Sequence, residues 1–440
     1  MASKKLGRDA ILATFFDDGA YTTLFADGPA AAAFGSANGQ PVYAVCQNGA
    51  ALSAKDLEKT VRVLELAAKT GNPIVTFYDS VGAKLDEGLA VLSANATLSA
   101  AVAQLSGVVP QVAVVVGVCG ASAALAAANA DVCIMAEEAE LFFTPPFTSA
   151  AKGDKLANAG SAEFAAKAGV AALVAKDAAE AALMAAHVVG LLPSNNLSSP
   201  SVFAFEAPVT AFPAKRDPAA ALAALADKDS LLPLYEGFGK KAVTALGTLN
   251  GNAVGFVAAG DLLCRSCVSK IARFVRLCDA FSVPLVTVVD TDGFVPSSTE
   301  DAAGGIREAA RLAATYGDAT TARVAVVSGK AVGPVYAALA SADLVVALAG
   351  CTIAPVEPKA AVSVLYKDEL DASDNIEAAA KAKAAQYAAE VCSAEAAVEA
   401  GVADFVASPA GVRGAVLSAL DMLATKRASR MPKKHGNMSL

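Results

Sequence analysis

Tryptophan is absent from this chain of 440 residues, and histidine occurs only twice, as His187 and His435. Two histidines are too few for a metal centre built from clustered imidazoles. Cysteine occurs eight times, but Cys264 and Cys267 form the only Cys-x-x-Cys pair, so the second half of a zinc ribbon is missing. We therefore expect reduced thiols and no metal ion.

Charged residues are scarce. Asp, Glu, Lys and Arg make up 18% of the chain, and the net charge is −8. An acidic balance argues against a nucleic-acid partner, although residues 426–435 form a basic stretch that we expect to be a solvated tail. The N-terminal residues are charged and lead into no hydrophobic signal core. These features predict a cytoplasmic location.

No uninterrupted apolar run reaches the length of a membrane span. The most apolar segment, 108–130, is broken by Pro110, Gln111 and Asn129. Its counterpart around Val324 lies in a plainly soluble context. The segment is therefore predicted to be a buried strand followed by a helix.

The chain does contain a long internal repeat. The hexapeptide at Val112–Gly117 returns 212 residues later at Val324–Gly329, and an Ala-rich stretch ending in Ala-Asp follows both copies. A last repeated tetrapeptide occurs at 168–171 and at 400–403. The spacing between these two copies is about 20 residues longer than that of the other repeats, which indicates an insertion in the second copy. Two copies of roughly 200 residues each have the size of ordinary domains. The pattern predicts a duplicated domain.

Strands and helices alternate within each copy, which predicts an α/β fold. Short β-branched runs predict strands at 41–46, 74–78, 112–116, 253–257, 285–289 and 324–327. Amphipathic spacing predicts helices at 52–69, with Ser53 as N-cap, and at 269–281. The Ala-rich segment 376–399 predicts one or two exposed helices.

A segment rich in Pro, Ser and Asn, from residue 192 to residue 230, separates the two copies. We place the boundary near residue 215. The predicted domains are therefore 1–215 and 216–440.

In both copies a buried strand ends at Gly, passes through small residues and enters a helix, at 117–123 and at 329–336. Such a turn aims backbone N–H groups from the helix N-terminus at one point, where they can hold an anion or a developing oxyanion. Tight strand-to-helix packing alone also explains a single Gly-rich turn. The repetition of the turn favours the functional interpretation.

These motifs resemble the carboxyltransferase (beta) subunits of biotin-dependent acyl-CoA carboxylases and decarboxylases of the propionyl-CoA and methylmalonyl-CoA type. The resemblance extends over nearly the whole chain. It is carried by 77–88, 117–122, 192–196, 254–257, 270–281, 289–294, 329–333 and 432–437.

The resemblance implies two tandem crotonase-like (ββα-spiral) domains. It implies that the first domain binds acyl-CoA and the second binds carboxybiotin, with the active site between opposite domains of two subunits. Biotin would arrive on a biotin carboxyl carrier protein, since this chain has no Met-Lys-Met attachment site. The carboxyl group would move between carboxybiotin and the α-carbon of a short acyl-CoA, through enolates held in two backbone oxyanion holes.

Carried over by position, the first oxyanion hole falls on Ala121 and Ser122, where the family has Gly-Gly. The second falls on Pro334 and Val335, where the family has Gly-Ala. Proline has no N–H to donate, so Gly333 or Val335 is expected to supply the remaining donors.

Further residues are expected to bind substrate by the same resemblance. Lys84 replaces an Arg and would meet a CoA phosphate as a point charge, while a solvated Lys is an equal alternative. Asp292 replaces the Pro of an Asp-Thr-Pro-Gly-Phe turn. Ala337 matches a position that lines the acyl pocket. The full set of predicted substrate-binding residues is Ser80, Gly82, Ala83, Lys84, Gly120, Gly293, Phe294, Tyr336 and Ala337.

The predicted partners are the carrier protein together with biotin carboxylase or membrane decarboxylase subunits. Membrane association would come only through those partners. The chain itself is expected to form a homo-oligomer, at least a dimer, with a hexamer as a trimer of dimers as the larger alternative.

Three other functions stay open at this point. The first is a sodium-pumping acyl-CoA decarboxylase subunit, and the second is a scaffold subunit impaired by Pro334. The third is an esterase with Ser122 as nucleophile, which needs a base such as His187 and lacks the final Gly of the nucleophile elbow.

Overall fold

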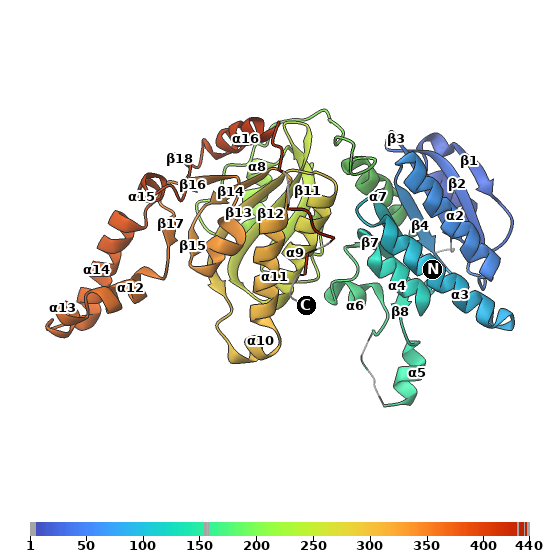
Figure 1. The fold of residues 1–440 in the computed structure, drawn as a ribbon, viewed down its shortest axis with the longest axis horizontal. Helices are drawn as coiled ribbons and strands as arrows, with labels where there is room; N and C mark the ends of the chain where they lie inside the picture. Colours follow the sequence, from blue (N-terminus) through green and yellow to red (C-terminus); the bar gives the residue numbers. More distant parts are fainter. Residues whose placement is uncertain (1–5, 154–155, 157, 429–430, 435, 438–440) are drawn as a thin grey trace. The chain divides into compact units, whose positions relative to one another are not determined.

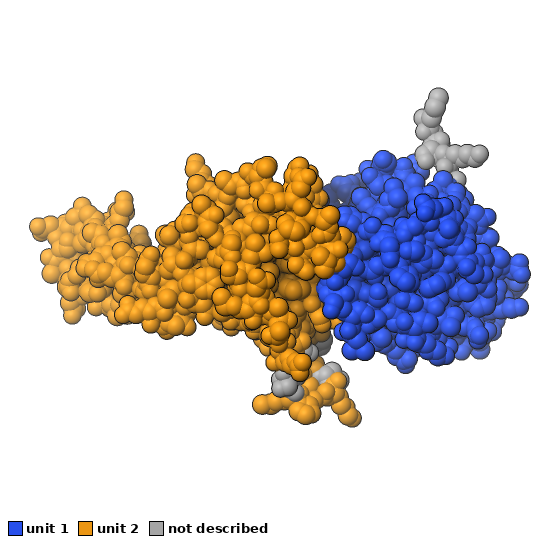
Figure 2. Space-filling model, turned by 90° about the horizontal axis from the view of Figure 1, so that it is seen from above, with its two compact units in different colours: residues 1–201, 235–238 blue, residues 202–234, 239–440 orange. Residues whose placement is uncertain are grey.

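The computed structural model describes residues 6–153, 156, 158–428, 431–434 and 436–437. The first five residues, Arg430 and His435, which belong to the charged N-terminus and the basic tail, lie outside the described residues. The chain divides into two compact units, coloured separately in Figure 2. Unit 1 comprises 1–201 and 235–238, and unit 2 comprises 202–234 and 239–440. The predicted boundary at residue 215 falls inside a segment that packs with unit 2.

Unit 1 alternates strands and helices along most of its length (Figure 1). Its strands are β1 (Tyr21–Phe25), β2 (Ala30–Ala37), β3 (Gln40–Gln47), β4 (Ile74–Tyr78), β5 (Gln111–Val115), β6 (Val118–Gly120), β7 (Val132–Ala136), β8 (Glu140–Phe142) and β9 (Leu173–Ala175). Its helices are α1 (Arg8–Phe15), α2 (Ala54–Thr70), α3 (Leu89–Leu105), α4 (Ser122–Asn129), α5 (Pro146–Ala151), α6 (Ala162–Lys167) and α7 (Ala178–Leu191), with 3-10 turns η1 (Asp17–Gly19) and η2 (Leu85–Glu87).

Unit 2 repeats this order with additional helices. Its strands are β10 (Leu232–Leu234), β11 (Ala242–Leu249), β12 (Asn252–Leu263), β13 (Leu285–Phe294), β14 (Arg323–Val327), β15 (Lys330–Val332), β16 (Leu344–Leu348), β17 (Thr352–Ala354) and β18 (Phe405–Ala407). Its helices are α8 (Pro218–Leu225), α9 (Arg265–Ala280), α10 (Ser298–Ala302), α11 (Gly305–Asp318), the π-helix η3 (Tyr336–Ala340), α12 (Pro358–Leu365), α13 (Lys367–Asp371), α14 (Ile376–Val391), α15 (Ala394–Glu399) and α16 (Val412–Leu423).

The two units have the same sheet topology. The seven-stranded sheet of unit 1 has the order β1-β2-β3-β4-β5-β7-β9, and that of unit 2 has the order β10-β11-β12-β13-β14-β16-β18. In both, the first three strands pair antiparallel and the others parallel. A small second sheet accompanies each, β6-β8 and β15-β17. Every strand of unit 1 therefore has a counterpart in unit 2, and the predicted duplication and α/β fold are confirmed.

Helices cover both faces of each main sheet. In unit 1, alternate strand residues pack with α2, α3 and α4 in one core, whereas α1 and α7 pack on each other and on the other face. In unit 2, α8 and α16 share a core with one face, and α9 packs with α11. Strands buried on both faces explain why their sequences are continuously apolar rather than alternating.

Both copies contain the same Asn-Gly hairpin turn between their second and third strands. Asn38 and Gly39 join β2 to β3 with φ of 49° and 78°, and Asn250 and Gly251 join β11 to β12 with 54° and 77°. Positive φ at two successive residues is the reason for the Asn-Gly pair. An aspartate accepts both turn N–H groups in each copy, Asp17 in unit 1 and Asp227 in unit 2.

The insertion predicted in the second copy lies between β17 and α15. Residues 355–393 occupy this place and form α12, α13 and α14, whereas the equivalent stretch of unit 1, from β8 to α6, contains the short helix α5. The Ala-rich segment forms α14 and α15, as predicted. Among the described residues, no helix is both long enough and apolar enough to span a bilayer.

Candidate functional site

The first repeated turn joins β5 to α4. Ala121 has φ 53° and ψ −122°, a conformation that glycine normally adopts. Its N–H donates to the carbonyl oxygen of Phe142 in β8 at 3.0 Å. A Cβ at Gly120 would come within 2.8 Å of the Phe142 ring. The short β6-β8 sheet therefore fixes the approach of the chain to the helix.

The second turn joins β14 to η3 by the same devices. Gly333 has φ 54°, and its N–H donates to the carbonyl oxygen of Ala354 in β17 at 2.8 Å. Position by position, Gly333 is the counterpart of Ala121, and Pro334 is the counterpart of Ser122. The helical residues begin at Ser122 in the first turn and at its counterpart Pro334 in the second, where the π-helix η3 follows from Tyr336.

An aspartate from the neighbouring strand segment supports each turn, and it is buried in unit 1 (Asp79) and partly exposed in unit 2 (Asp290). Asp79 accepts from the N–H of Val118 at 3.3 Å, and Asp290 accepts from the N–H of Lys330 at 3.1 Å. A Cβ at Gly117 would lie 1.9 Å from Asp79 Oδ1, so only glycine fits there. The equivalent Cβ at Gly329 would lie 2.1 Å from Asp290 Oδ1. The sequence analysis assigned no role to these two aspartates, although both lie in stretches, 77–88 and 289–294, that carry the resemblance.

The two turns differ in the N–H groups that they leave available. The N–H groups of Ala121 and Gly333 are bonded within the small sheets, so these residues shape the turn. In the part of the chain that the structure describes, no acceptor is bonded to the N–H of Ser122, Ala123 or Val335. The first turn thus presents two neighbouring donors, and the second presents one because Pro334 has none. Ala123 was not predicted, and the signal for it is its place in the first turn of α4.

A bend at a glycine lies beside each turn, after β4 in unit 1 and in the last residues of β13 in unit 2. Gly82 and Gly293 both have φ 119°, and their N–H groups donate to Ser80 Oγ at 3.1 Å and to Thr291 Oγ1 at 3.2 Å. Ser80 Oγ also donates to the carbonyl oxygen of Ala50 at 2.8 Å. The predicted residues Ser80, Gly82 and Gly293 therefore belong to one structural device that both copies share.

Lys84 lies at the end of the unit 1 loop. Its N–H donates to Leu52 at 2.8 Å, and the strand-like bridge between Leu52 and Ala83 holds the loop against the start of α2. The Lys84 ammonium is 3.6 Å from Glu87 and 3.8 Å from Asp86, and about half of the side chain is exposed. An incoming phosphate would therefore compete with two carboxylates for this charge.

A cavity of about 210 Å³ lies beside Pro334 in unit 2. Two predicted residues, Phe294 and Pro334, line it. Tyr336 donates its hydroxyl to the carbonyl oxygen of Val402 at 2.6 Å, and burial raises its pKa. Ala337 is exposed on η3. The other main walls of the cavity come from Leu263, Arg265, Val268 and Ile306.

Comparison with known proteins identifies the family of the chain. Residues 16–438 match the carboxyl transferase domain. The chain belongs to this carboxyltransferase family.

Two relatives extend along most of the carboxyltransferase. It is 33% identical over 431 residues to the methylmalonyl-CoA carboxyltransferase 12S subunit of Propionibacterium freudenreichii subsp. shermanii, covering 92% of this chain and 82% of that protein. It is 30% identical over 437 residues to the methylmalonyl-CoA decarboxylase subunit alpha of Veillonella parvula, covering 92% and 84%. The predicted family is confirmed.

The fold agrees with a solved structure of the same family. The crystal structure of the transcarboxylase 12S hexamer assembly, with methylmalonyl-coenzyme A and methylmalonic acid bound, matches with a TM-score of 0.93 and 30% identity. The match covers 99% of this chain and 92% of that one. The predicted crotonase-like fold and the prediction of a carboxyltransferase enzyme are confirmed.

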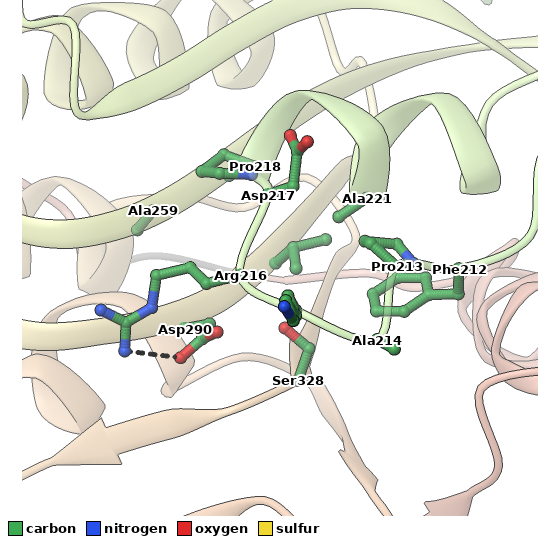
Figure 3. Close-up of a pocket in the computed structure, with 13 residues that line it drawn as sticks. Phe212, Pro213, Ala214, Arg216, Asp217, Pro218, Ala221, Ala259, Asp290 and Ser328 are labelled. Carbon is green, nitrogen blue, oxygen red and sulfur yellow. Dashed lines mark hydrogen bonds and ion pairs between the residues drawn. The ribbon is translucent and has the colours of Figure 1, made fainter.

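An ion-pair network braces the second turn of the carboxyltransferase. Arg216 bonds to Asp290 at 3.0 Å and also to Asp292, beside a cavity of about 60 Å³ that Ser328 also lines (Figure 3). Lys330 is 3.2 Å from Asp292 and 3.5 Å from Glu357. The hydrogen bond from Arg216, with that from Lys330, lowers the pKa of Asp292 to about 2. Asp292, the departure from the family's Pro, thus links the 212–218 segment to β13 and β15.

The esterase alternative finds no support in unit 1. Ser122 opens α4, which packs in the core with α3. His187 lies on α7, which packs with α1 on the other face of the sheet, and burial lowers its pKa. No hydrogen bond joins these two side chains, both of which the structure describes. No cluster of three or more metal-ligating side chains occurs among the described residues either.

Proposed function

We propose that this carboxyltransferase moves a carboxyl group between carboxybiotin and the α-carbon of a short acyl-CoA of the propionyl-CoA and methylmalonyl-CoA type. The observation that carries the proposal is the pair of matched turns at helix starts, where the first turn presents two unbonded N–H groups among the described residues and the second presents one. The substrate class follows from the two relatives and from the ligands bound to transcarboxylase 12S.

Unit 1 is proposed to stabilise the acyl-CoA enolate. The N–H groups of Ser122 and Ala123 would donate to the thioester oxygen as negative charge develops on it. Fixed donors of this kind contribute most when charge forms, because they need no reorganisation. The Gly120 and Ala121 backbone would let the carbonyl approach, and Lys84 would meet a CoA phosphate after leaving Glu87 and Asp86.

Unit 2 is proposed to receive the biotin of the carrier protein. When bound, carboxybiotin supplies the activated carboxyl group. The cavity of about 210 Å³ fits a ring system in size, and its walls at Phe294 and Ile306 suit the apolar, sulfur-containing ring of biotin. The N–H of Val335, next to the wall residue Pro334, would donate to the oxygen of the ring urea.

The proposed partners are a biotin carboxyl carrier protein and either biotin carboxylase or membrane decarboxylase subunits. The likeness to a hexamer supports a homo-oligomer of the same kind. The 30% identity to a methylmalonyl-CoA decarboxylase subunit also supports a decarboxylase complex as the setting of the same reaction.

A carboxyl-transfer assay tests the proposal. Purified chain is incubated with methylmalonyl-CoA and free biotin, and the formation of propionyl-CoA and carboxybiotin is followed by chromatography, with malonyl-CoA and a longer-chain α-carboxyacyl-CoA as comparison donors. We expect transfer from the short acyl-CoA esters. Binding of acyl-CoA without any transfer, including with a supplied carrier protein, would instead support the scaffold that Pro334 favours as the second candidate.

A further inference from the structure

Two cysteines meet at the start of α9 in unit 2. The sulfur atoms of Cys264 and Cys267 are 3.1 Å apart. Cys264 occupies the N-cap position and is partly exposed, whereas Cys267 is buried within the first turn. A disulfide requires about 2.05 Å between the sulfurs, so an approach of about 1 Å would allow a bond.

The equivalent positions of unit 1 hold an ordinary helix cap. Ser53 and Asp56 stand at the start of α2, where they form a capping box with Ser53 Oγ accepting from the N–H of Asp56 at 3.2 Å. No side-chain cap bond is made at the start of α9, which the structure describes fully. A cap of this kind stabilises the start of a helix. Unit 2 thus replaces a stabilising pair by two adjoining thiols.

The surroundings give the two thiols different reactivities. Burial, followed by the contact with Cys264, raises the pKa of Cys267 to about 11. Cys264, at the N-cap of the 16-residue helix, is the partly exposed member of the pair, so a small disulfide reaches its sulfur before that of Cys267. Gly239 packs directly on the Ser266–Cys267 backbone, where a Cβ would come within 2.8 Å. The backbone of the pair is therefore held in place.

We propose that Cys264 and Cys267 form a redox-active dithiol that exchanges with low-molecular-weight disulfides of the glutathione class. The Cys264 thiolate attacks one sulfur of the small disulfide, releases one thiol and forms a mixed disulfide. The Cys267 thiolate then attacks Sγ of Cys264 and releases the second thiol. Two protein thiols lose two protons and two electrons, and the small disulfide is reduced to two thiols.

The dithiol borders the cavity beside Pro334. Leu263, Arg265 and Val268, which flank the two cysteines, line that cavity, and the N–H of Arg265 donates to Glu300 at 2.5 Å. A disulfide across the first turn of α9 therefore alters a cavity wall and lowers carboxyl transfer. This consequence, unlike the dithiol itself, rests on the proposed function.

Thiol mapping of the full-length protein tests the dithiol. The reduced protein is equilibrated with mixtures of reduced and oxidised glutathione, quenched with an alkylating reagent and analysed by peptide mass spectrometry. We expect a Cys264–Cys267 disulfide, with a single glutathione trapped on Cys264 in Cys267→Ser and none in this segment in Cys264→Ser. The matched control Cys278→Ala, which removes a buried thiol of the same helix, should behave as the wild type. Both thiols remaining alkylated at every ratio would overturn the proposal.

Carboxyl transfer is then measured on the reduced and the oxidised protein, with Cys264→Ser/Cys267→Ser as the redox-insensitive control. We expect a severalfold loss of rate on oxidation in the wild type and no change in the control. A disulfide that forms without changing the rate overturns the link to the cavity. Absence of transfer in both redox states counts against the proposed function, while the thiol map still decides the dithiol.

Discussion

Pro334 and Ser122 occupy the same position of the repeated turn, directly after a residue with φ of 54° and 53°. Proline fits the start of a helix because the N–H that it lacks has no partner within the helix. The structure of the turn therefore tolerates Pro334 well. What it changes is the number of donors that face a ligand.

Replacement of Pro334 is expected to raise carboxyl transfer. Pro334→Ala and Pro334→Gly both add an N–H beside that of Val335, and one oxyanion donor is typically worth a factor of about 10² to 10³ in rate. The measurement is kcat for transfer from methylmalonyl-CoA to biotin. Both variants add the N–H, but glycine also makes the backbone more flexible. A similar kcat in both would therefore assign the gain to the new donor rather than to backbone flexibility. Unchanged or lower rates in both would show that Pro334 does not impair the site.

Asp292 provides a pH-dependent brace for the same turn. Its pKa is lowered to about 2 from the ordinary 3.8, chiefly by Arg216. A lowered folded-state pKa stabilises the fold above the unfolded value and loses this effect as the pH falls toward the folded value. We expect Asp292→Asn to have a lower Tm at neutral pH, with a gap from the wild type that narrows below about pH 4.

The measurement is differential scanning fluorimetry of both proteins between acidic and neutral pH at low and high salt. Because the side chain is 39% exposed, screening reduces the gap at high salt. A gap that is constant down to the lowest pH at which both proteins fold would contradict the assignment to the Asp292 carboxylate.

At the scale of elements, one aspartate holds the hairpin of each copy, but the two environments differ. Asp227 is 3% exposed and accepts from Asn250, Gly251, Thr248 and the Arg413 guanidinium at 2.7–2.9 Å. It thereby ties the β11-β12 turn to α16. Asp17, in an exposed position, accepts hydrogen bonds from the two turn N–H groups and from Ser36.

We therefore expect Asp227→Ala to lower the free energy of unfolding by about 3–5 kcal/mol, because it leaves the Arg413 charge without its ion-pair partner and the turn N–H groups without their acceptor. Asp17→Ala is the matched control and should cost roughly 1 kcal/mol. Urea unfolding followed by circular dichroism gives both values. Equal losses in the two variants would refute the role of burial.

The elements that sequence could predict are those with a strong local signal. The β-branched runs at β4, β5 and β14 and the Ser53 cap of α2 were predicted nearly to the residue. Three-residue strands such as β6 and β8 carry no periodicity and were not predicted. The N–H of Ala121 donates to the carbonyl oxygen of Phe142 in β8, which lies 21 residues further along the chain. Which N–H groups of the turn stay free to donate to a ligand therefore depends on the pairing of β6 with β8. No local sequence pattern predicts this long-range pairing.

At the scale of the whole molecule, the repeat relates two sites that are proposed to serve one reaction. If both turns act on the same transfer, loss of either should stop it, and a second loss should add little. If each unit acted alone, the effects would be independent. A variant for this test can be designed from the second turn, where Gly333-Pro334 adopts the same backbone geometry that Ala121-Ser122 adopts in the first turn.

The variant Ala121→Gly/Ser122→Pro copies that sequence into unit 1 and removes one donor with the turn preserved. We expect kcat to fall by about 10² to 10³, with Ala121→Gly alone as the control that keeps the donor and the rate. Addition of Pro334→Ala should restore little, because the acyl-CoA step would then limit the rate. Circular dichroism and acyl-CoA binding verify that the variants fold. A triple variant that recovers the full gain seen with Pro334→Ala alone would show that the two turns work on separate reactions.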